Sequence, residues 1–81
     1  MLIYFRKAHG TSSPNLYEWR VEGSETWYRI YRDNIHFIKG SGAEKEIIDL
    51  AENGETVLVE AFYFKMDIKA LIIGNKVARK K

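Results

Sequence analysis

Residues 17–32 constrain the fold most strongly, because two segments of alternating apolar and polar residues flank a clear turn signal. The middle of this region places Gly23 and Ser24 between two glutamates. Glycine at the first central position is typical of a two-residue type II′ turn, whose twist matches that of antiparallel strands. The sequence therefore predicts a β-hairpin with strands over Tyr17 to Val21 and Thr26 to Arg32.

The turn also predicts the register of this hairpin, and the register separates two faces. Tyr17 is expected opposite Ile30 and Glu18 opposite Arg29, while side chains alternate between the faces along each strand. The face expected to join the core consists of Tyr17, Trp19, Val21, Tyr28 and Ile30. The opposite face consists of Glu18, Arg20, Glu22, Glu25, Trp27, Arg29 and Tyr31.

Three further strands are predicted from runs of apolar and β-prone residues. The first spans Leu2 to Ala8 and ends at a cluster of turn-forming residues. The second, Ile35 to Lys39, is expected to return antiparallel to the hairpin through a tight turn at residues 33–34. The third, Thr56 to Lys65, is almost continuously apolar, which is typical of a buried central strand.

One helix is predicted between Ala43 and Asn53. Ser41 and Glu44 have the spacing of a capping box, and Gly54 supplies a C-terminal stop. The apolar arc of this helix consists of Ala43, Ile47, Ile48, Leu50 and Ala51. The polar arc consists of Lys45, Glu46, Asp49 and Glu52. This one-sided pattern predicts that the helix packs on one face of a sheet.

The C-terminal segment has two interpretations. Residues 70–73 and 76–78 flank Gly74 and Asn75, which favours a strand, a turn and a second strand. The alternative is a short helix capped by Asp67, although Gly74 and Asn75 would interrupt it. The segment is therefore predicted as a β-hairpin, with a short helix as the alternative.

Because 81 residues provide one core only, the whole of 1–81 is predicted to form a single domain. Its class is α+β: a small antiparallel β-meander sheet with one α-helix packed on one face. The expected order is four strands, the helix, a fifth strand and then the C-terminal β-hairpin or short helix. Residues 76–81 form a basic C-terminal tail.

The chain contains no cysteine, which excludes disulfides, thiolate nucleophiles and cysteine-based zinc or iron–sulfur sites. The apolar N-terminal run ends after five residues, too few for a signal peptide, and no run approaches the roughly 20 residues of a membrane helix. We therefore expect a soluble cytoplasmic protein with no membrane partner. Because a core of this size is marginal, a homodimer is a reasonable expectation.

The charge is unevenly distributed although the net charge is only +2. Residues 41–60 contain one Lys against six Asp and Glu, whereas residues 61–81 contain six Lys and Arg against one Asp. An acidic helix is therefore followed by a basic end. The pattern is typical of a solvated helix face with a solubilising tail, and the alternative is a polarised binding surface.

The residues that could carry chemistry are sparse. His9 and His36 are the two histidines, and a catalytic serine would need one of them together with an orienting carboxylate. Asp33 and His36 supply two ligand types at one turn, where a metal site needs three converging groups. Asp67 begins an Asp-x-Lys pattern of some metal-dependent nucleases, but three residues recur often by chance. The sequence predicts no enzyme, no cofactor and no metal.

The outward face of the predicted hairpin is the candidate site, because Trp, Tyr and Arg dominate protein-interface hot spots. Arg20 is expected within cation–π reach of Trp27 there. The first hypothesis is a small protein-binding module of regulator, inhibitor or subunit type, with a partner of unknown identity. Its predicted binding residues are Arg20, Trp27, Arg29 and Tyr31, with Glu46, Asp49 and Glu52 of the helix as a second contact region.

The second hypothesis is a nucleic-acid-binding module, because aromatics interleaved with basic residues suit base stacking and phosphate contact. Its residues are Arg20, Trp27, Arg29 and Tyr31 together with Lys76, Arg79, Lys80 and Lys81. Two alternatives remain open. A register shifted by one residue, or a C-terminal segment packed over this face, would make Trp27 part of the core. A structural homodimer would use the hairpin face or the basic end as its self-contact.

Overall fold

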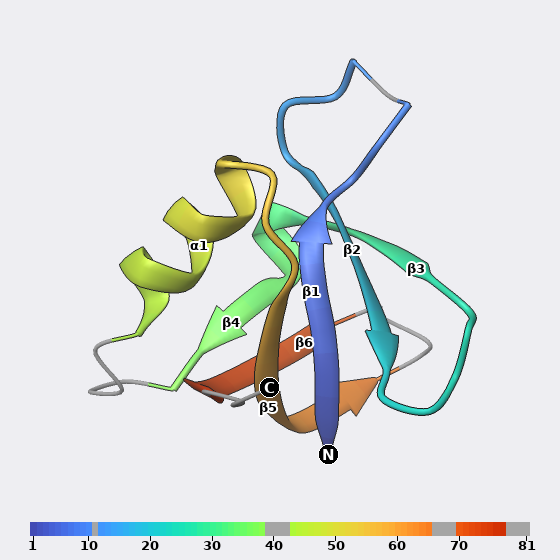
Figure 1. Cartoon of the computed structure of the whole chain (residues 1–81). Helices are drawn as coiled ribbons and strands as arrows, with labels where there is room; N and C mark the ends of the chain where they lie inside the picture. Colours follow the sequence, from blue (N-terminus) through green and yellow to red (C-terminus); the bar gives the residue numbers. More distant parts are fainter. Residues whose placement is uncertain (11, 39–42, 66–69, 78–81) are drawn as a thin grey trace.

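Six strands in the described part of the chain form one curled sheet, accompanied by one α-helix (Figure 1). The computed structural model describes residues 1–10, 12–38, 43–65 and 70–77, without the side chains of 62–65. The strands are β1 (Leu2–Lys7), β2 (Leu16–Val21), β3 (Tyr28–Tyr31), β4 (Ile35–Phe37), β5 (Val57–Lys65) and β6 (Ala70–Lys76). The 3-10 turn η1 (Arg32–Asn34) joins β3 to β4, and the helix α1 (Glu44–Glu52) lies between β4 and β5 in the chain.

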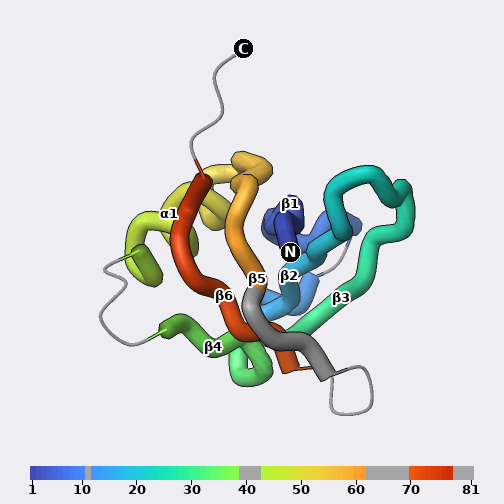
Figure 2. The backbone as a smooth tube through the Cα atoms, turned by 90° about the horizontal axis from the view of Figure 1, so that it is seen from below, coloured from blue at the N-terminus to red at the C-terminus, as the bar shows by residue number. Residues whose placement is uncertain are grey.

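The strand order across the sheet is β3-β2-β1-β5-β6-β4, so β3 and β4 are its edges. Neighbouring strands are antiparallel except β4 and β6, which are parallel. Figure 2 shows that the strands curve around a common interior, which the core side chains fill. The prediction of a small α+β domain is therefore confirmed, whereas the prediction of a purely antiparallel meander is wrong.

The first hairpin has the predicted register. Tyr17 pairs with Ile30, and Glu18 pairs with Arg29. The turn itself differs, because the Ser24 N–H donates to the Val21 carbonyl at 2.9 Å, which makes residues 22 and 23 the central pair. Glycine at position 23 has φ +92° and occupies the second central position, where a type II turn requires a positive φ.

The second predicted hairpin does not form. Residues 32–34 make one turn of 3-10 helix, in which the Ile35 N–H bonds to the Arg32 carbonyl, and β4 leaves in a new direction. Strand β4 pairs in parallel with β6, with Ile35 opposite Leu71. A tight hairpin turn needs positive φ at its central residues, and the sequence offers no glycine there. The burial of Ile35 in the same core cluster as Ile30 stabilises the alternative path.

The C-terminal segment is a single strand instead of a hairpin or a helix. Strand β6 continues through Gly74 and Asn75 to Lys76. Between the pairs Val59–Lys76 and Ala61–Ile73, β6 has one residue more than β5, so the glycine marks a β-bulge and not a turn. Because β6 lies between β5 and β4, its backbone finds partners on both sides.

The helix forms as predicted, but its N-terminus differs. Ala43 is the N-cap and makes no side-chain capping bond, while the predicted cap Ser41 lies outside the described residues. The C-terminal stop is confirmed. Gly54 at φ +88° and Glu55 donate backbone hydrogen bonds to the carbonyls of residues 51 and 50, both at 3.0 Å, which is a Schellman motif.

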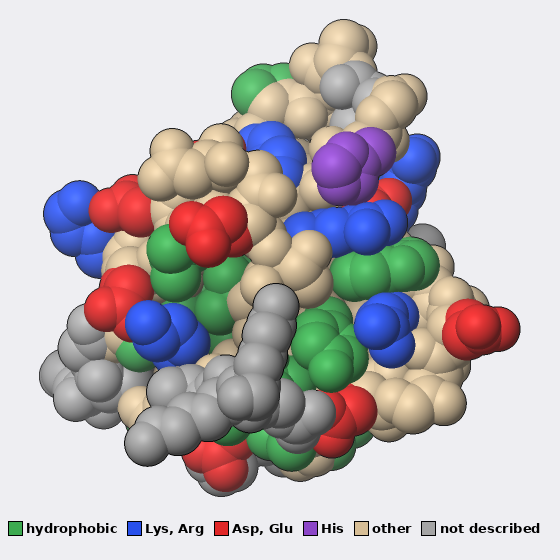
Figure 3. All heavy atoms as spheres, in the orientation of Figure 1, with side chains coloured by type: hydrophobic (Ala, Val, Ile, Leu, Met, Phe, Trp, Pro, Cys, Tyr) green, Lys and Arg blue, Asp and Glu red, His purple; other side chains and the backbone are tan. Residues whose placement is uncertain are grey.

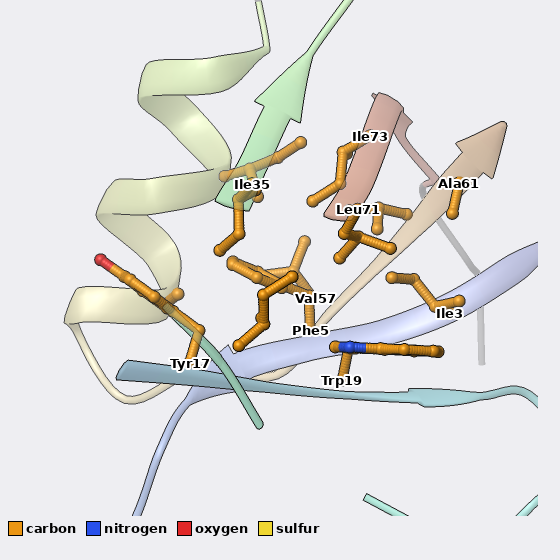
Figure 4. Close-up of a cluster of buried hydrophobic side chains, with 13 residues drawn as sticks. Ile3, Phe5, Tyr17, Trp19, Ile35, Val57, Ala61, Leu71 and Ile73 are labelled. Carbon is orange, nitrogen blue, oxygen red and sulfur yellow. The ribbon is translucent and has the colours of Figure 1, made fainter. Parts of the chain in front are cut away.

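The core lies between the inner side of the sheet and α1, with aromatic and aliphatic side chains from all six strands and the helix (Figure 4). It consists of Ile3, Phe5, Tyr17, Trp19, Ile30, Ile35, Ile47, Ala51, Val57, Val59, Ala61, Leu71 and Ile73. Three of the five residues predicted for the inner hairpin face are buried here, and Val21 packs partly buried against them. Tyr28 is different: it stacks on Trp19 at 4.8 Å between ring centroids but is 39% exposed, because it belongs to an edge strand.

Candidate interaction surface

The outer side of β1, β2 and β3 carries the predicted hairpin residues together with two residues of β1. In β1 the alternate residues Ile3 and Phe5 are fully buried, so Tyr4 and Arg6 point to the opposite side of the sheet. We call this surface the arginine–aromatic face. It consists of Tyr4, Arg6, Glu18, Arg20, Trp27, Arg29 and Tyr31. Figure 3 shows cationic and hydrophobic side chains next to one another on the side of the molecule where β1 lies in front.

Trp27 lies against two guanidinium groups. The guanidinium carbon of Arg6 is 3.6 Å from the centroid of the Trp27 ring, and that of Arg20 is 5.4 Å away. Arg20 also lies over the Tyr4 ring at 4.3 Å. Rings and cations therefore alternate across β1, β2 and the residue that precedes β3. The predicted contact between Arg20 and Trp27 is confirmed, and the closer partner Arg6 is new.

Glu18 holds two of the arginines in place. It is only 6% exposed, and its two oxygens accept hydrogen bonds from the Nε atoms of Arg6 at 2.9 Å and Arg29 at 3.2 Å. The Arg29 side chain remains 54% exposed and donates a further hydrogen bond to the His9 carbonyl at 3.1 Å. Because one carboxylate serves two guanidinium groups, this cluster keeps a net positive charge.

The loop after β2 is fixed to the same face. Arg20 donates from Nη1 to the Ser24 carbonyl at 2.8 Å, and the Tyr4 hydroxyl donates to Glu22 at 3.2 Å. A shallow open depression lies beside Trp27, lined by Arg20, Gly23, Ser24, Glu25 and Trp27. Its rim therefore presents a cation, a carboxylate and an indole ring to solvent.

The two aromatic residues predicted for this face differ in exposure. Tyr31 is 56% exposed at the end of β3, whereas Trp27 is half-buried. Trp27 does not belong to the core cluster, in which Trp19 is the buried indole. Trp27 therefore lies on the outer side of the sheet, as the predicted register requires.

The acidic residues predicted on the helix lie away from this face. The buried side of α1 packs against the inner side of β1 and β5, through Ile47 and Ala51. Each acidic residue of α1 forms an ion pair within the chain: Glu44 with Arg32, Glu46 with Lys76, Asp49 with Lys45 and Glu52 with Lys7. The structure therefore does not unite the two predicted contact regions, and cations of this chain already balance the helical carboxylates.

The basic residues predicted for nucleic-acid binding are not gathered on the arginine–aromatic face either. Lys76, at the end of β6, pairs with Glu46 at 2.6 Å beside the helix. Arg79, Lys80 and Lys81 lie outside the described residues. In the described part of the chain, the cations that contact Tyr4 and Trp27 are Arg6 of β1 and Arg20 of β2.

Two ionisable groups near α1 have shifted pKa values. Burial raises the pKa of the Tyr17 phenol above 10.0, and the charge of Glu52 and its hydrogen bond raise it further, while the charge of Arg32 opposes the shift. The hydroxyl donates to Glu52 at 3.2 Å. A hydrogen bond to Asp49 and its charge raise the pKa of Lys45.

Of the residues considered for catalysis or metal binding, the structure describes His9, Asp33 and His36. His9 and His36 are both exposed, and Asp67 lies outside the described residues. Within the described ranges, no three His, Asp or Glu side chains converge to hold a metal ion. The helix in that part of the chain is too short to cross a bilayer.

Sequence reasoning missed Tyr4 and Arg6. Both lie on β1, and their place on this face depends on the pairing of β1 with β2, which sets Tyr4 opposite Arg20 and Arg6 opposite Glu18. The alternation Ile-Tyr-Phe-Arg at residues 3–6 is the signal that could have found them, once β1 is paired with β2. In comparisons with known proteins, no family model, no curated protein and no solved structure matches the chain significantly.

Proposed function

We propose that this chain is a non-enzymatic protein-binding module of regulator, inhibitor or subunit type that docks through its arginine–aromatic face. The observation that carries the proposal is the Arg6 guanidinium held 3.6 Å from the centroid of the half-buried Trp27 ring. Tryptophan, tyrosine and arginine are the residues most enriched at interface hot spots, and here they share one surface.

The order of these side chains before binding supports the proposal. Glu18 fixes Arg6 and Arg29, and Arg20 is held by the Ser24 carbonyl and the Tyr4 ring. Immobilising long side chains at an interface normally opposes association. A surface that is already ordered in the free protein avoids part of this loss.

A nucleic-acid module has less support. A base that stacked on Trp27 would have to compete with the guanidinium groups of Arg6 and Arg20. Glu18 and Glu22 also contact residues of this face, and their negative charge opposes phosphate binding. A protein partner can present both positive and negative side chains to this mixed charge, whereas the phosphate backbone of a nucleic acid is uniformly anionic.

The proposal is tested by the affinity of partners captured from cells that express the chain. For each captured protein, Kd is measured with the parent, Trp27→Ala, Arg6→Ala and the control Lys45→Ala, whose side chain is 88% exposed on the helix. Truncating a hot spot costs about 2 kcal/mol or more, so binding to Trp27→Ala should weaken by roughly 30-fold. The control should bind like the parent, and unchanged affinity of both face variants would contradict the proposal.

A second measurement separates the two functions. Tryptophan emission of the parent, with Trp27→Phe as the reference, is followed while single- and double-stranded oligonucleotides are added at low salt. We expect no change in the signal assigned to Trp27. Binding that perturbs this signal and weakens steeply with added salt would instead favour the nucleic-acid hypothesis.

A further inference from the structure

Strand β3 is an edge of the sheet that the described residues form. In the described part of the chain it pairs with β2 alone, and β3 lies along the margin of the fold in both ribbon views (Figures 1 and 2). Three of its four residues are exposed: Tyr28 is 39% exposed, Tyr31 is 56% exposed, and the Arg29 side chain is 54% exposed. An edge strand presents unpaired backbone groups to any chain that can extend beside it.

The register identifies which backbone groups point outward. The Arg32 N–H donates to the Asn15 carbonyl at 2.8 Å, which makes these residues a hydrogen-bonded pair. Hydrogen-bonded and non-hydrogen-bonded pairs alternate along an antiparallel ladder. Arg29 and Tyr31 therefore lie in non-hydrogen-bonded pairs with β2, so the N–H and C=O of Arg29 and the N–H of Tyr31 face away from β2. As the N-cap of η1, Tyr31 directs its carbonyl into that turn. The partner of Tyr31 in this pairing is Leu16. The Leu16 carbonyl accepts a hydrogen bond from the Ala8 N–H on the β1 side at 3.1 Å, so it points away from β3, as a non-hydrogen-bonded pair requires.

The charge beside this edge selects one kind of strand. Arg29 shares Glu18 with Arg6, so this group of three charged side chains has one net positive charge. A strand added next to β3 would place alternate side chains on this side, adjacent to Arg29 and Tyr31. Acidic side chains at those positions would pair with Arg29. A second copy of β3 fits less well, because residues 26–32 contain two arginines and no acidic residue.

We propose that the β3 edge accepts an extended acidic segment of a partner protein as a seventh strand. The inference rests on the proposed protein-binding function and specifies its partner and its mode. The outward N–H and C=O groups of Arg29 and the outward N–H of Tyr31 bind the backbone of the added strand, which supplies affinity independent of sequence. Arg29 favours acidic side chains at alternate positions of the added strand. These side chains lie on the same side of the sheet as the arginine–aromatic face.

Tyr31 allows the backbone contribution to be tested alone. Its φ of −80° lies close to the value that proline imposes, and its N–H is outside the β2 ladder. Tyr31→Pro removes the outward N–H and the side chain, whereas Tyr31→Ala removes the side chain only. The difference between these two variants reports the hydrogen bond to the added strand. Circular dichroism and thermal unfolding verify that both variants are folded.

The probe is the tightest-binding peptide selected from a library of random extended peptides displayed on phage and panned against the parent protein. We expect acidic residues at every second position of the selected sequences. Affinity should fall by at least about tenfold from Tyr31→Ala to Tyr31→Pro, because a lost backbone hydrogen bond leaves a peptide carbonyl unpaired. Arg29→Gln should bind the acidic peptide more weakly, and replacing the acidic residues of the peptide with Gln should remove that difference.

Three outcomes would overturn the inference. Equal affinity of Tyr31→Pro and Tyr31→Ala for the peptide would show that the β3 edge is not used. If Trp27→Ala still lost binding in that case, the proposed protein-binding function would remain supported while the added strand would be excluded. Selected peptides without acidic residues, or no selected peptide at all, would contradict the acidic strand. A parent protein that is dimeric in solution and becomes monomeric only in Tyr31→Pro would assign the edge to a second copy of the chain.

Discussion

The two sides of β1 differ in what their residues do. On the inner side Ile3 and Phe5 are fully buried, and Phe5 stacks on Tyr17 at 5.2 Å between ring centroids. On the outer side Tyr4 and Arg6 lie half-buried among arginines and aromatic rings. Adjacent residues of one strand therefore belong to two different environments, one apolar and close-packed, the other polar and hydrogen-bonded.

This difference separates stability from recognition. Burying apolar area stabilises a fold strongly, whereas exposed ion pairs and cation–π contacts contribute about 1 kcal/mol or less each. Apart from those of the buried Glu18, the outer contacts order long side chains at little gain in stability. Single substitutions on the arginine–aromatic face are therefore expected to leave the domain folded, because the inner side carries the fold.

The largest expected effect tests the inner side. Phe5→Ala should lower the free energy of unfolding by about 3 to 5 kcal/mol, because it leaves a cavity among fully buried side chains. The neighbouring change Tyr4→Ala should lower it by about 1 kcal/mol or less, since its ring is half-buried on the outer side. Urea unfolding of both variants measures the contrast, and equal losses would show that the two sides contribute alike.

The next largest effect concerns the one buried charge of the outer side. Glu18→Gln should lower the free energy of unfolding by about 1 to 3 kcal/mol, because two arginines lose their shared carboxylate. Glu25→Gln is the matched control, since Glu25 is exposed and its loss should be nearly neutral. A neutral Glu18→Gln would mean that solvent replaces the carboxylate and that the outer network does not order its arginines.

A smaller effect is expected for the contact between Arg6 and Trp27. A double-mutant cycle of Arg6→Ala and Trp27→Ala, measured by urea unfolding, should give a coupling energy of about 0.5 to 1 kcal/mol. The cycle of Arg6→Ala with Tyr31→Ala provides the comparison, since the polar and ring contacts of Arg6 in the described residues are with Glu18 and Trp27, and Tyr31 pairs with Leu16. Coupling near zero in the first cycle would mean that Arg6 and Trp27 are merely neighbours.

The elements that depend on local signals could be predicted from the sequence. The alternation around Gly23 gave the register of β2 and β3, and the apolar arc with Gly54 gave α1 and its end. The path of β4 could not be predicted, because each of its residues pairs with a β6 residue 36 positions further along the chain. Gly74 was misassigned for the same reason: a bulge glycine and a turn glycine have one local signature, and only the partner strands separate them.

The candidate site shows the same limit. Arg20, Trp27 and Arg29 were predicted together because one hairpin contains them all. Arg6 could not be added, because its place beside Trp27 depends on the pairing of β1 with β2 across a loop of eight residues. The intrachain ion pairs that balance the helical acids also involve residues distant in sequence, such as Lys7 with Glu52.

The smallest expected effect concerns Tyr17, whose phenol makes the free energy of unfolding depend on pH. Burial and Glu52 raise the pKa of the Tyr17 phenol, so the folded state favours the neutral form more than the unfolded chain does. The resulting stability is fully present below about pH 10, where a free phenol ionises, and is lost as the pH rises through the raised pKa of the folded state. Tyr17→Phe should therefore lose less stability than the parent over that alkaline range.

Glu52→Gln sharpens this prediction, because it should lower the pKa of Tyr17 by removing the carboxylate that opposes the phenolate. Ultraviolet difference spectra of the parent minus Tyr17→Phe, recorded across the alkaline range, follow the phenolate directly. An unchanged titration in Glu52→Gln would mean that burial alone sets the pKa of Tyr17. The Tyr17 phenol would then behave like the apolar side chains of the inner side, and polar contacts that affect a buried residue would be confined to the arginine–aromatic face.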